Sequence, residues 1–167
     1  MITHERLIEL LHYDPKTGEF RWAKSRRGAK RGAVAGSIKK DGHMVITLDR
    51  EAYAAARIAF FYMTKRWPSP EADHADRDGL NNKWENIREA TRVQNGSNRM
   101  SRNKTGLKGI FATHYRDKTY YTARIKVDSE QIYLGTRHTA KEAHELYRDA
   151  AIRLHGEFAC MEAEETR

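Results

Sequence analysis

The sequence predicts a mixed α+β protein made of several small modules. Polar and apolar residues alternate strictly from Thr122 to Val127, as in a strand with one buried face. A capping box at Thr139 then opens a segment with helical spacing of apolar residues. Two short strand-like segments flank a turn-rich loop at residues 76–82. With 167 residues and 39% hydrophobic content, the chain can bury modest cores rather than one large core.

The first part of the chain is predicted to form a scaffold over residues 1–70. Apolar residues from Thr3 to His12 favour a short amphipathic helix, and Tyr13 to Trp22 is typical of a strand, a turn and a strand. Two more strands are expected between Val34 and Leu48, joined at an Asp-Gly hairpin signal. An apolar stretch from Tyr53 to Met63 predicts a largely buried helix.

Two basic features of this scaffold leave alternatives open. The glycine-containing loop from Lys24 to Gly32 is either a solvated connection or a contact for the DNA backbone. Arg57, a lone arginine on the apolar helix, either reaches a phosphate or extends to solvent.

The central segment brings together side chains suited to phosphodiester chemistry. We expect Asp73 and His74 to end one strand and residues 84–88 to form the next, after which a capping box from Thr91 to Gln94 opens a helix that carries Asn95. A neutral histidine can generate hydroxide near pH 7, and hard oxygen ligands suit Mg²⁺ or Mn²⁺. Runs of Asp, Asn and Gly also build ordinary solvated turns, so the residue types alone leave both interpretations open.

The order of these residues resembles the core of HNH endonucleases, in the subgroup common among phage homing enzymes. The resemblance is carried by Glu71–Gly79, Asn82, Trp84, Asn86–Arg88, Thr91 and Gln94-Asn95. It implies a ββα-metal core over residues 71–98, with His74 as general base, Asp73 and Asn95 as ligands of one divalent ion, and Asn86 as the residue that pins the loop. Many HNH proteins have a second histidine where this chain has Asn95, which favours Mg²⁺ or Mn²⁺ over Zn²⁺.

A polar, basic stretch at residues 99–106 is the expected linker to a second domain at 107–160. We expect three antiparallel strands, near Gly109–Thr113, Thr122–Val127 and Gln131–Leu134. The helix that follows Thr139 has apolar residues at core-facing spacing, so it should cover one face of the sheet. The other face stays open, and between residues 102 and 126 the chain has seven Lys and Arg against one acidic residue.

This second domain resembles the AP-two/ethylene-response-factor DNA-binding domain, whose three-stranded sheet enters the major groove. The resemblance is carried by residues 105–110, 121–125, 132–135, 139–143, 147–151 and 156–159. It implies DNA contacts from Lys108, Arg116, Tyr121, Arg124 and Lys126. Plant members often have Trp on the second strand where this chain has Tyr120 or Tyr121.

The composition agrees with a nucleic-acid partner. The chain has 31 Lys and Arg against 23 Asp and Glu, a net charge of +8, so it should attract the phosphate backbone of double-stranded DNA. Its single cysteine, Cys160, excludes an internal disulfide framework and a cysteine-ligated zinc cluster. The sequence lacks an apolar run of membrane-spanning length and a signal-peptide pattern, so we expect a cytoplasmic protein, in the host cell if a phage encodes it, with no membrane partner.

Two functions from different classes fit these features. In the first, the chain is a homing-type DNA endonuclease that nicks one strand as a monomer, with one Mg²⁺ or Mn²⁺, and finds its target with the C-terminal sheet. In the second, it is a sequence-specific DNA-binding regulator with an inactive HNH scaffold.

Residues 161–167 form the expected acidic tail.

Overall fold

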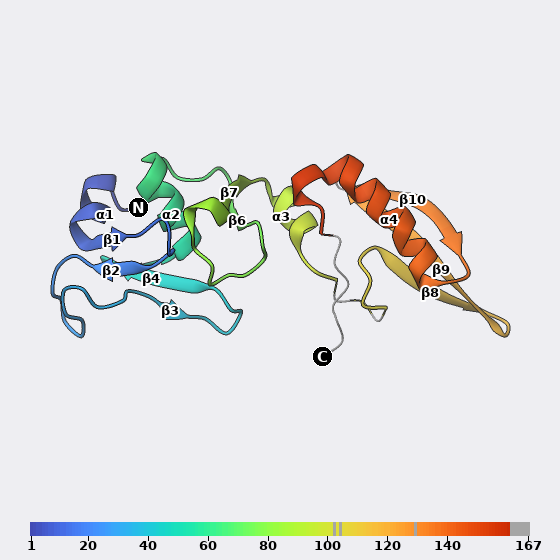
Figure 1. Cartoon of the computed structure of the whole chain (residues 1–167), viewed down its shortest axis with the longest axis horizontal. Helices are drawn as coiled ribbons and strands as arrows, with labels where there is room; N and C mark the ends of the chain where they lie inside the picture. The colour runs from blue at the N-terminus through green and yellow to red at the C-terminus, as the bar shows by residue number, and fades with distance from the viewer. Residues whose placement is uncertain (102, 104, 129, 161–167) are drawn as a thin grey trace. The chain divides into compact units, whose positions relative to one another are not determined.

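The computed structural model describes residues 1–101, 103, 105–128 and 130–160 and shows a mixed α+β chain (Figure 1). The chain divides into two compact units, residues 1–91 and 92–167. This boundary lies earlier than the expected domain end at residue 98, because the helix at 92–98 packs against the 3-10 helix at 156–158 of the second unit. The expected acidic tail and two residues of the expected linker lie outside the described residues.

The first unit begins with α1 (His4–Leu10), whose N-cap Thr3 accepts a hydrogen bond from the backbone N–H of Arg6. The predicted helix is two residues too long at its C-terminal end. Leu11 is extended and begins β1 (Leu11–Tyr13), which pairs antiparallel with β2 (Phe20–Trp22). Pairing with β2 supplies backbone hydrogen bonds that end the helix early.

A second sheet follows, in the order β3 (Ser37–Ile38), β4 (Met44–Leu48) and β5 (Glu51–Ala54). The hairpin predicted between residues 34 and 48 is confirmed. The helix predicted from Tyr53 starts too early, because Tyr53 lies in β5 and pairs with Ile46 of β4. The helix α2 (Ala55–Thr64) buries six apolar side chains in the core of this unit.

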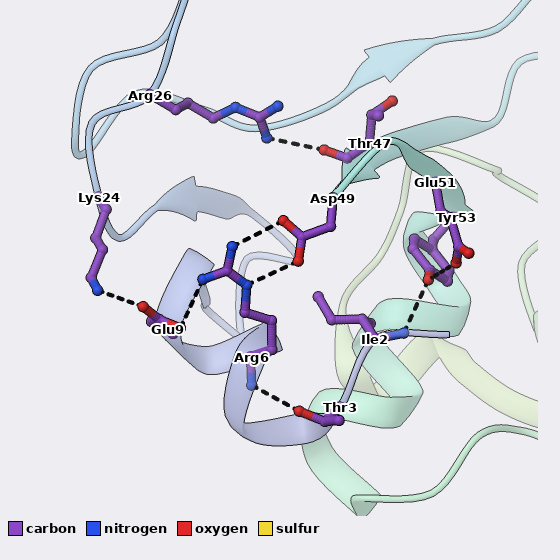
Figure 2. Close-up of polar contacts among 10 residues, drawn as sticks. All are labelled: Ile2, Thr3, Arg6, Glu9, Lys24, Arg26, Thr47, Asp49, Glu51 and Tyr53. Atoms are coloured by element: carbon purple, nitrogen blue, oxygen red, sulfur yellow. Dashed lines mark hydrogen bonds and ion pairs between the residues drawn. The ribbon is translucent and has the colours of Figure 1, made fainter.

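Ion pairs hold α1 to the loop that follows β4 (Figure 2). The Arg6 guanidinium donates to both carboxylate oxygens of Asp49, at 2.9 and 3.0 Å, and to Glu9 at 2.9 Å. Lys24 donates to the other oxygen of Glu9 at 2.7 Å. Arg26 donates to the backbone carbonyl of Thr47 at 3.1 Å. The first two cations of the basic loop at 24–32 therefore stabilise the fold.

The central hairpin pairs β6 (Glu71–His74) with β7 (Ile87–Ala90). The predicted strand at 84–88 is partly wrong, because Trp84–Asn86 form the 3-10 helix η1 and the strand begins at residue 87. Arg57 of α2 donates to the carbonyl oxygen of Pro70 at 2.7 Å, so this arginine binds the segment that leads into β6.

The second unit contains α3 (Arg92–Asn98), β8 (Ile110–Tyr115), β9 (Lys118–Val127), β10 (Glu130–Arg137), α4 (Ala140–His155) and η2 (Gly156–Phe158). The predicted antiparallel sheet is confirmed, with β9 in the centre, and α4 lies along one face of it (Figure 1). The capping box of Thr139 and Glu142 is also confirmed. None of the helices within the described residues is long and apolar enough to cross a membrane.

An ion pair ties the segment after α2 to β7. Both terminal nitrogens of Arg66 donate to Glu89, at 2.6 and 2.8 Å, and the backbone N–H of Ser69 donates to the same carboxylate at 2.6 Å. The hydrogen bonds from Arg66, and then from Ser69, lower the pKa of Glu89 to about 2.

Replacing Glu89 with Gln should destabilise the first unit in a pH-dependent way. The unfolded chain protonates Glu89 near pH 4.5, so the stabilisation is complete above that pH and is lost as the pH falls toward about 2. The urea midpoints of wild type and Glu89→Gln should therefore differ above pH 4.5 and converge near pH 2. Tryptophan fluorescence reports on this unit alone, because all three tryptophans lie within residues 1–91.

The matched control is Glu85→Gln, at an exposed carboxylate on η1. A difference between wild type and Glu89→Gln that persists unchanged down to pH 2 would contradict the assigned pKa.

Candidate functional site

The hairpin of β6 and β7 places the predicted site residues on the last two positions of β6. Asp73 pairs in register with Arg88, and His74 pairs with Ile87. Successive strand residues point to opposite faces, so the Asp73 carboxylate and the His74 ring leave the strand in different directions. Both side chains are buried.

His74 is held by a side chain that the sequence analysis did not assign to the site. Its Nε2 lies 3.1 Å from Oδ1 of Asn82, and both side chains are buried. A carboxamide oxygen can only accept, so Nε2 donates the proton and Nδ1 carries the lone pair of the neutral ring. Burial lowers the pKa of His74, the hydrogen bond to Asn82 opposes this, and the charge of His43 adds to the lowering. His74 is therefore neutral at pH 7, the form that a general base needs.

The N-terminal scaffold fixes the position of Asn82. Its backbone carbonyl accepts a hydrogen bond from the Tyr13 hydroxyl at 2.7 Å, and burial raises the pKa of that hydroxyl. The turn between β1 and β2 also approaches closely, because a Cβ at Gly18 would lie 2.5 Å from the carbonyl carbon of Asn82. Asn82 is only 1% exposed, so the scaffold holds the partner of His74 rigidly.

Asn86 joins the two arms of the loop that follows His74. Its Oδ1 accepts the backbone N–H of Asp76 at 3.0 Å. Its Nδ2 donates to Asp76 Oδ1 at 2.9 Å and to the carbonyl oxygen of Asn81 at 2.7 Å. The backbone N–H of Ala75 donates to the carbonyl of Asn86 at 2.9 Å. These four bonds are what a residue that pins the loop would make.

Asp73, the predicted metal ligand, forms an ion pair with Arg88. Oδ2 of Asp73 accepts from Nε of Arg88 at 3.0 Å and from Nη2 at 2.9 Å. The Asp73 side chain is 6% exposed and that of Arg88 is 16% exposed. Burying a carboxylate without a cationic partner is costly, and Arg88 provides that partner. Any divalent ion at Asp73 must therefore share or replace this ion pair.

The second predicted ligand, Asn95, lies on α3 and belongs to the second unit. The structure thus brings Asp73, His74 and Asn86 together within the first unit. Within the described part of the chain, no group of three or more His, Cys, Asp or Glu side chains is arranged to hold a metal ion. The predicted ligands Asp73 and Asn95 are one carboxylate and one carboxamide, so they would not count as a group of this kind.

A second histidine lies beside His74. The ring of His43, from the turn between β3 and β4, is centred 6.1 Å from the His74 ring. The loop after β6 passes directly against this turn, because a Cβ at Gly79 would lie 2.9 Å from both the His43 ring and the Gly42 carbonyl oxygen. His43 has no signal in the sequence that links it to this site, since only the tertiary fold joins the hairpin at residue 43 to the loop at residue 79.

In the second unit, the sheet face opposite α4 carries cations and aromatic rings. Strand register places on it Phe111, Thr113 and Tyr115 of β8, Tyr120, Thr122, Arg124 and Lys126 of β9, and Gln131 and Tyr133 of β10. The guanidinium of Arg124 lies 5.8 Å from the ring centre of Phe111, and its Nη1 is 3.5 Å from Oε1 of Gln131. Exposed guanidinium and aromatic groups of this kind can contact base edges and phosphates.

Tyr121 lies on the other face of β9. It is separated from the buried Ala123 by two positions and packs partly against the core cluster beneath α4. The aromatic residue of β9 on the open face is Tyr120, whose ring centre lies 5.3 Å from that of His138. Strand alternation thus places the Tyr121 ring on the face toward α4, whereas Arg124 and Lys126 lie on the open face; its DNA contact stays a prediction.

The remaining two predicted DNA contacts differ in their surroundings. Arg116 lies at the turn between β8 and β9, with a φ of 51° and its guanidinium 5.3 Å from the ring centre of Tyr115. The ammonium of Lys108 donates to the carbonyl oxygens of Gly96, Ser97 and Arg99 at the C-terminal end of α3. Carbonyls at the C-terminal end of a helix lack intrahelical partners, so a lysine ammonium can bind them favourably.

Comparisons with protein-family models, with curated proteins and with solved structures found no match to this chain.

The imidazole of His74 should titrate below pH 6.5. Burial disfavours the charged ring, so the folded protein releases this proton at a lower pH than the reference value of 6.5. Imidazole nitrogen resonances recorded across the pH range measure the midpoint. The variant Asn82→Ala should titrate lower still, because its hydrogen bond is the main contribution that raises the pKa. A wild-type midpoint at or above 6.5 would show that the ring is not held in the neutral form.

Proposed function

We propose that the protein is a homing-type DNA endonuclease that nicks one strand of its target. The observation that carries this proposal is the buried ring of His74 at the end of β6, whose Nε2 lies 3.1 Å from Oδ1 of the buried Asn82 and whose pKa is lowered by burial. A fixed imidazole with a lowered pKa is suited to remove a proton from water at neutral pH. The resemblance of residues 71–95 to HNH endonucleases supports the same role.

In the proposed reaction, His74 takes a proton from a water molecule, and the resulting hydroxide attacks the phosphodiester. The new bond joins this oxygen to phosphorus, and the bond from phosphorus to one ester oxygen breaks. The ester oxygen leaves with the electron pair of that bond and takes up a proton from solvent. The loop pinned by Asn86 keeps His74 and its partner Asn82 in place during this step. Exclusion of water around the buried ring strengthens the hydrogen bond that orients it.

One Mg²⁺ or Mn²⁺ belongs to the proposal, and the resemblance to HNH endonucleases implies Asp73 and Asn95 as its ligands. A bound divalent ion supplies charge that stabilises the phosphate and the departing oxygen. The donor chemistry fits, because both ligands are hard oxygen donors, and the buried Asp73 already pairs with a cation. The ion pair with Arg88 means that binding of the ion has to compete with this guanidinium.

The second unit would deliver the nuclease to its target. Its open face carries Arg124 and Lys126 on the central strand, as a sheet that enters the major groove requires. Tyr120 replaces Tyr121 in this interpretation, and Lys108 has a structural role at the end of α3. The partner is double-stranded DNA, which a monomer would bind.

The second candidate is a DNA-binding regulator with an inactive nuclease scaffold. The observation that favours it is the ion pair of Asp73 with Arg88, which already neutralises the carboxylate that would hold the metal. This candidate shares the DNA-reading sheet and differs only in whether the DNA is cut.

A supercoiled plasmid that carries the natural target region separates the two candidates. In Mg²⁺, the intact chain should convert the plasmid to the nicked circle, and His74→Ala should lower the rate by roughly 10²- to 10⁴-fold, the usual contribution of a general base. His12→Ala, at an exposed histidine on β1, is the matched control and should nick at the wild-type rate. Tight binding by the wild type without nicking would establish the regulator instead.

A second experiment tests the division of labour between the units. Replacing both Arg124 and Lys126 with Ala should weaken target binding. The slope of log affinity against log salt concentration should fall by up to the amount expected for the loss of about two phosphate contacts. Slow nicking of unrelated DNA should persist. Lys141→Ala, at an exposed lysine on α4, is the control, because α4 covers the opposite sheet face. If the double variant binds the target with unchanged affinity, the open sheet face is not the surface that recognises the target.

A further inference from the structure

A histidine pair lies at the candidate site, and the proposed reaction uses only one member. His74 is 8% exposed, whereas 56% of the His43 side chain is exposed, with the two ring centres 6.1 Å apart and their planes inclined by 49°. One ring is therefore buried, and the other is exposed to solvent beside it. A group that contacted both rings would have to fit within this 6.1 Å spacing.

Asp41 orients the second ring. Nδ1 of His43 lies 3.4 Å from Oδ1 of Asp41, and the same oxygen accepts the backbone N–H of His43 at 3.2 Å. With Nδ1 facing the carboxylate, Nε2 carries a proton only in the imidazolium form, in which both nitrogens donate. In that form the ring can donate one hydrogen bond to Asp41 and a second to an anion.

The spacing between the rings depends on Gly79. A methyl group at this position would lie 2.9 Å from Cδ2 of His43 and 2.9 Å from the carbonyl oxygen of Gly42. The backbone N–H of Met44 also points at the carbonyl of Gly79, at 3.5 Å. The absence of a side chain at 79 thus allows the hairpin of His43 to approach the loop that carries Asn82.

We propose that His43, oriented by Asp41, contacts the phosphodiester on which His74 acts and stabilises the negative charge of its transition state. The inference rests on the proposed nuclease function and adds a substrate-contacting residue to it. In its imidazolium form, His43 donates a hydrogen bond from Nε2 to a non-bridging phosphate oxygen, while His74 removes the proton from water. Donors aimed at developing charge contribute to the rate rather than to ground-state binding.

Single-turnover nicking of a supercoiled plasmid in Mg²⁺, with saturating full-length protein, tests this role. His43→Ala should lower the rate constant by about tenfold or more, less than a fully buried donor would contribute, because the His43 side chain is 56% exposed. Plasmid affinity should stay within about twofold of wild type, because one exposed donor contributes little to ground-state binding. His43→Gln keeps a donor and should recover part of the rate, and Asp41→Asn should show a smaller loss than His43→Ala.

Two further variants separate a contact with substrate from a structural role. Gly79→Ala leaves His43 and His74 in the chain but forces them apart, so it should lower the nicking rate with little change in affinity. His12→Ala, at an exposed histidine of the same unit, should nick like the wild type.

Inorganic phosphate is the second probe and needs no cleavage. In the wild type, phosphate should shift the imidazole resonances of both His43 and His74, and it should leave those of His12 unchanged. Nicking by His43→Ala at the wild-type rate would overturn the inference while the nuclease function stands. A rate loss matched by an equal loss of affinity would also overturn it. A wild-type protein that never nicks would instead overturn the proposed function, and the inference with it.

Discussion

The candidate site depends on the fixed position of Asn82. The Tyr13 hydroxyl donates a hydrogen bond to its backbone carbonyl, Gly18 allows the first hairpin to contact its backbone, and its side-chain oxygen accepts a hydrogen bond from Nε2 of His74. A buried asparagine leaves a costly unpaired group unless its partners stay in place. The N-terminal scaffold therefore determines which nitrogen of His74 carries the lone pair, and it also contributes His43 to the proposed site.

The two hairpins around this asparagine have different tasks. The loop after β6 is tied by Asn86, which bonds to residues on both of its arms, and this keeps the loop closed over a short span. The turn between β3 and β4 lies against the same loop at Gly79 and brings in His43. A single site thus combines a rigid, buried imidazole with an exposed one, and their environments differ enough to suit different roles.

Local patterns predicted most of the secondary structure. Strand alternation and the capping box were sufficient for β9 and α4, because both signals lie within a few residues along the chain. The errors lie at element ends, where long-range pairing outweighs local preference. Leu11 was expected in the first helix but pairs with Trp22 in a strand. Tyr53 was expected in the second helix but pairs with Ile46 in a strand. Tyr121 and Ala123 are two positions apart in a strand and therefore lie on the same face of the sheet. This relation was already present in the sequence.

The sequence by itself determined the mixed α+β class, the strand that ends in Asp73 and His74, and the amphipathic sheet and helix of the second unit. Periodicity and local hydrogen-bonding residues encode these features. Only the tertiary structure decided the partners of the site residues: Asn82 for His74, Arg88 for Asp73, and His43 at the rim. Such pairs join residues by contacts between loops and strands. The sequence pattern alone does not predict these contacts, because they depend on how the hairpins pack against one another.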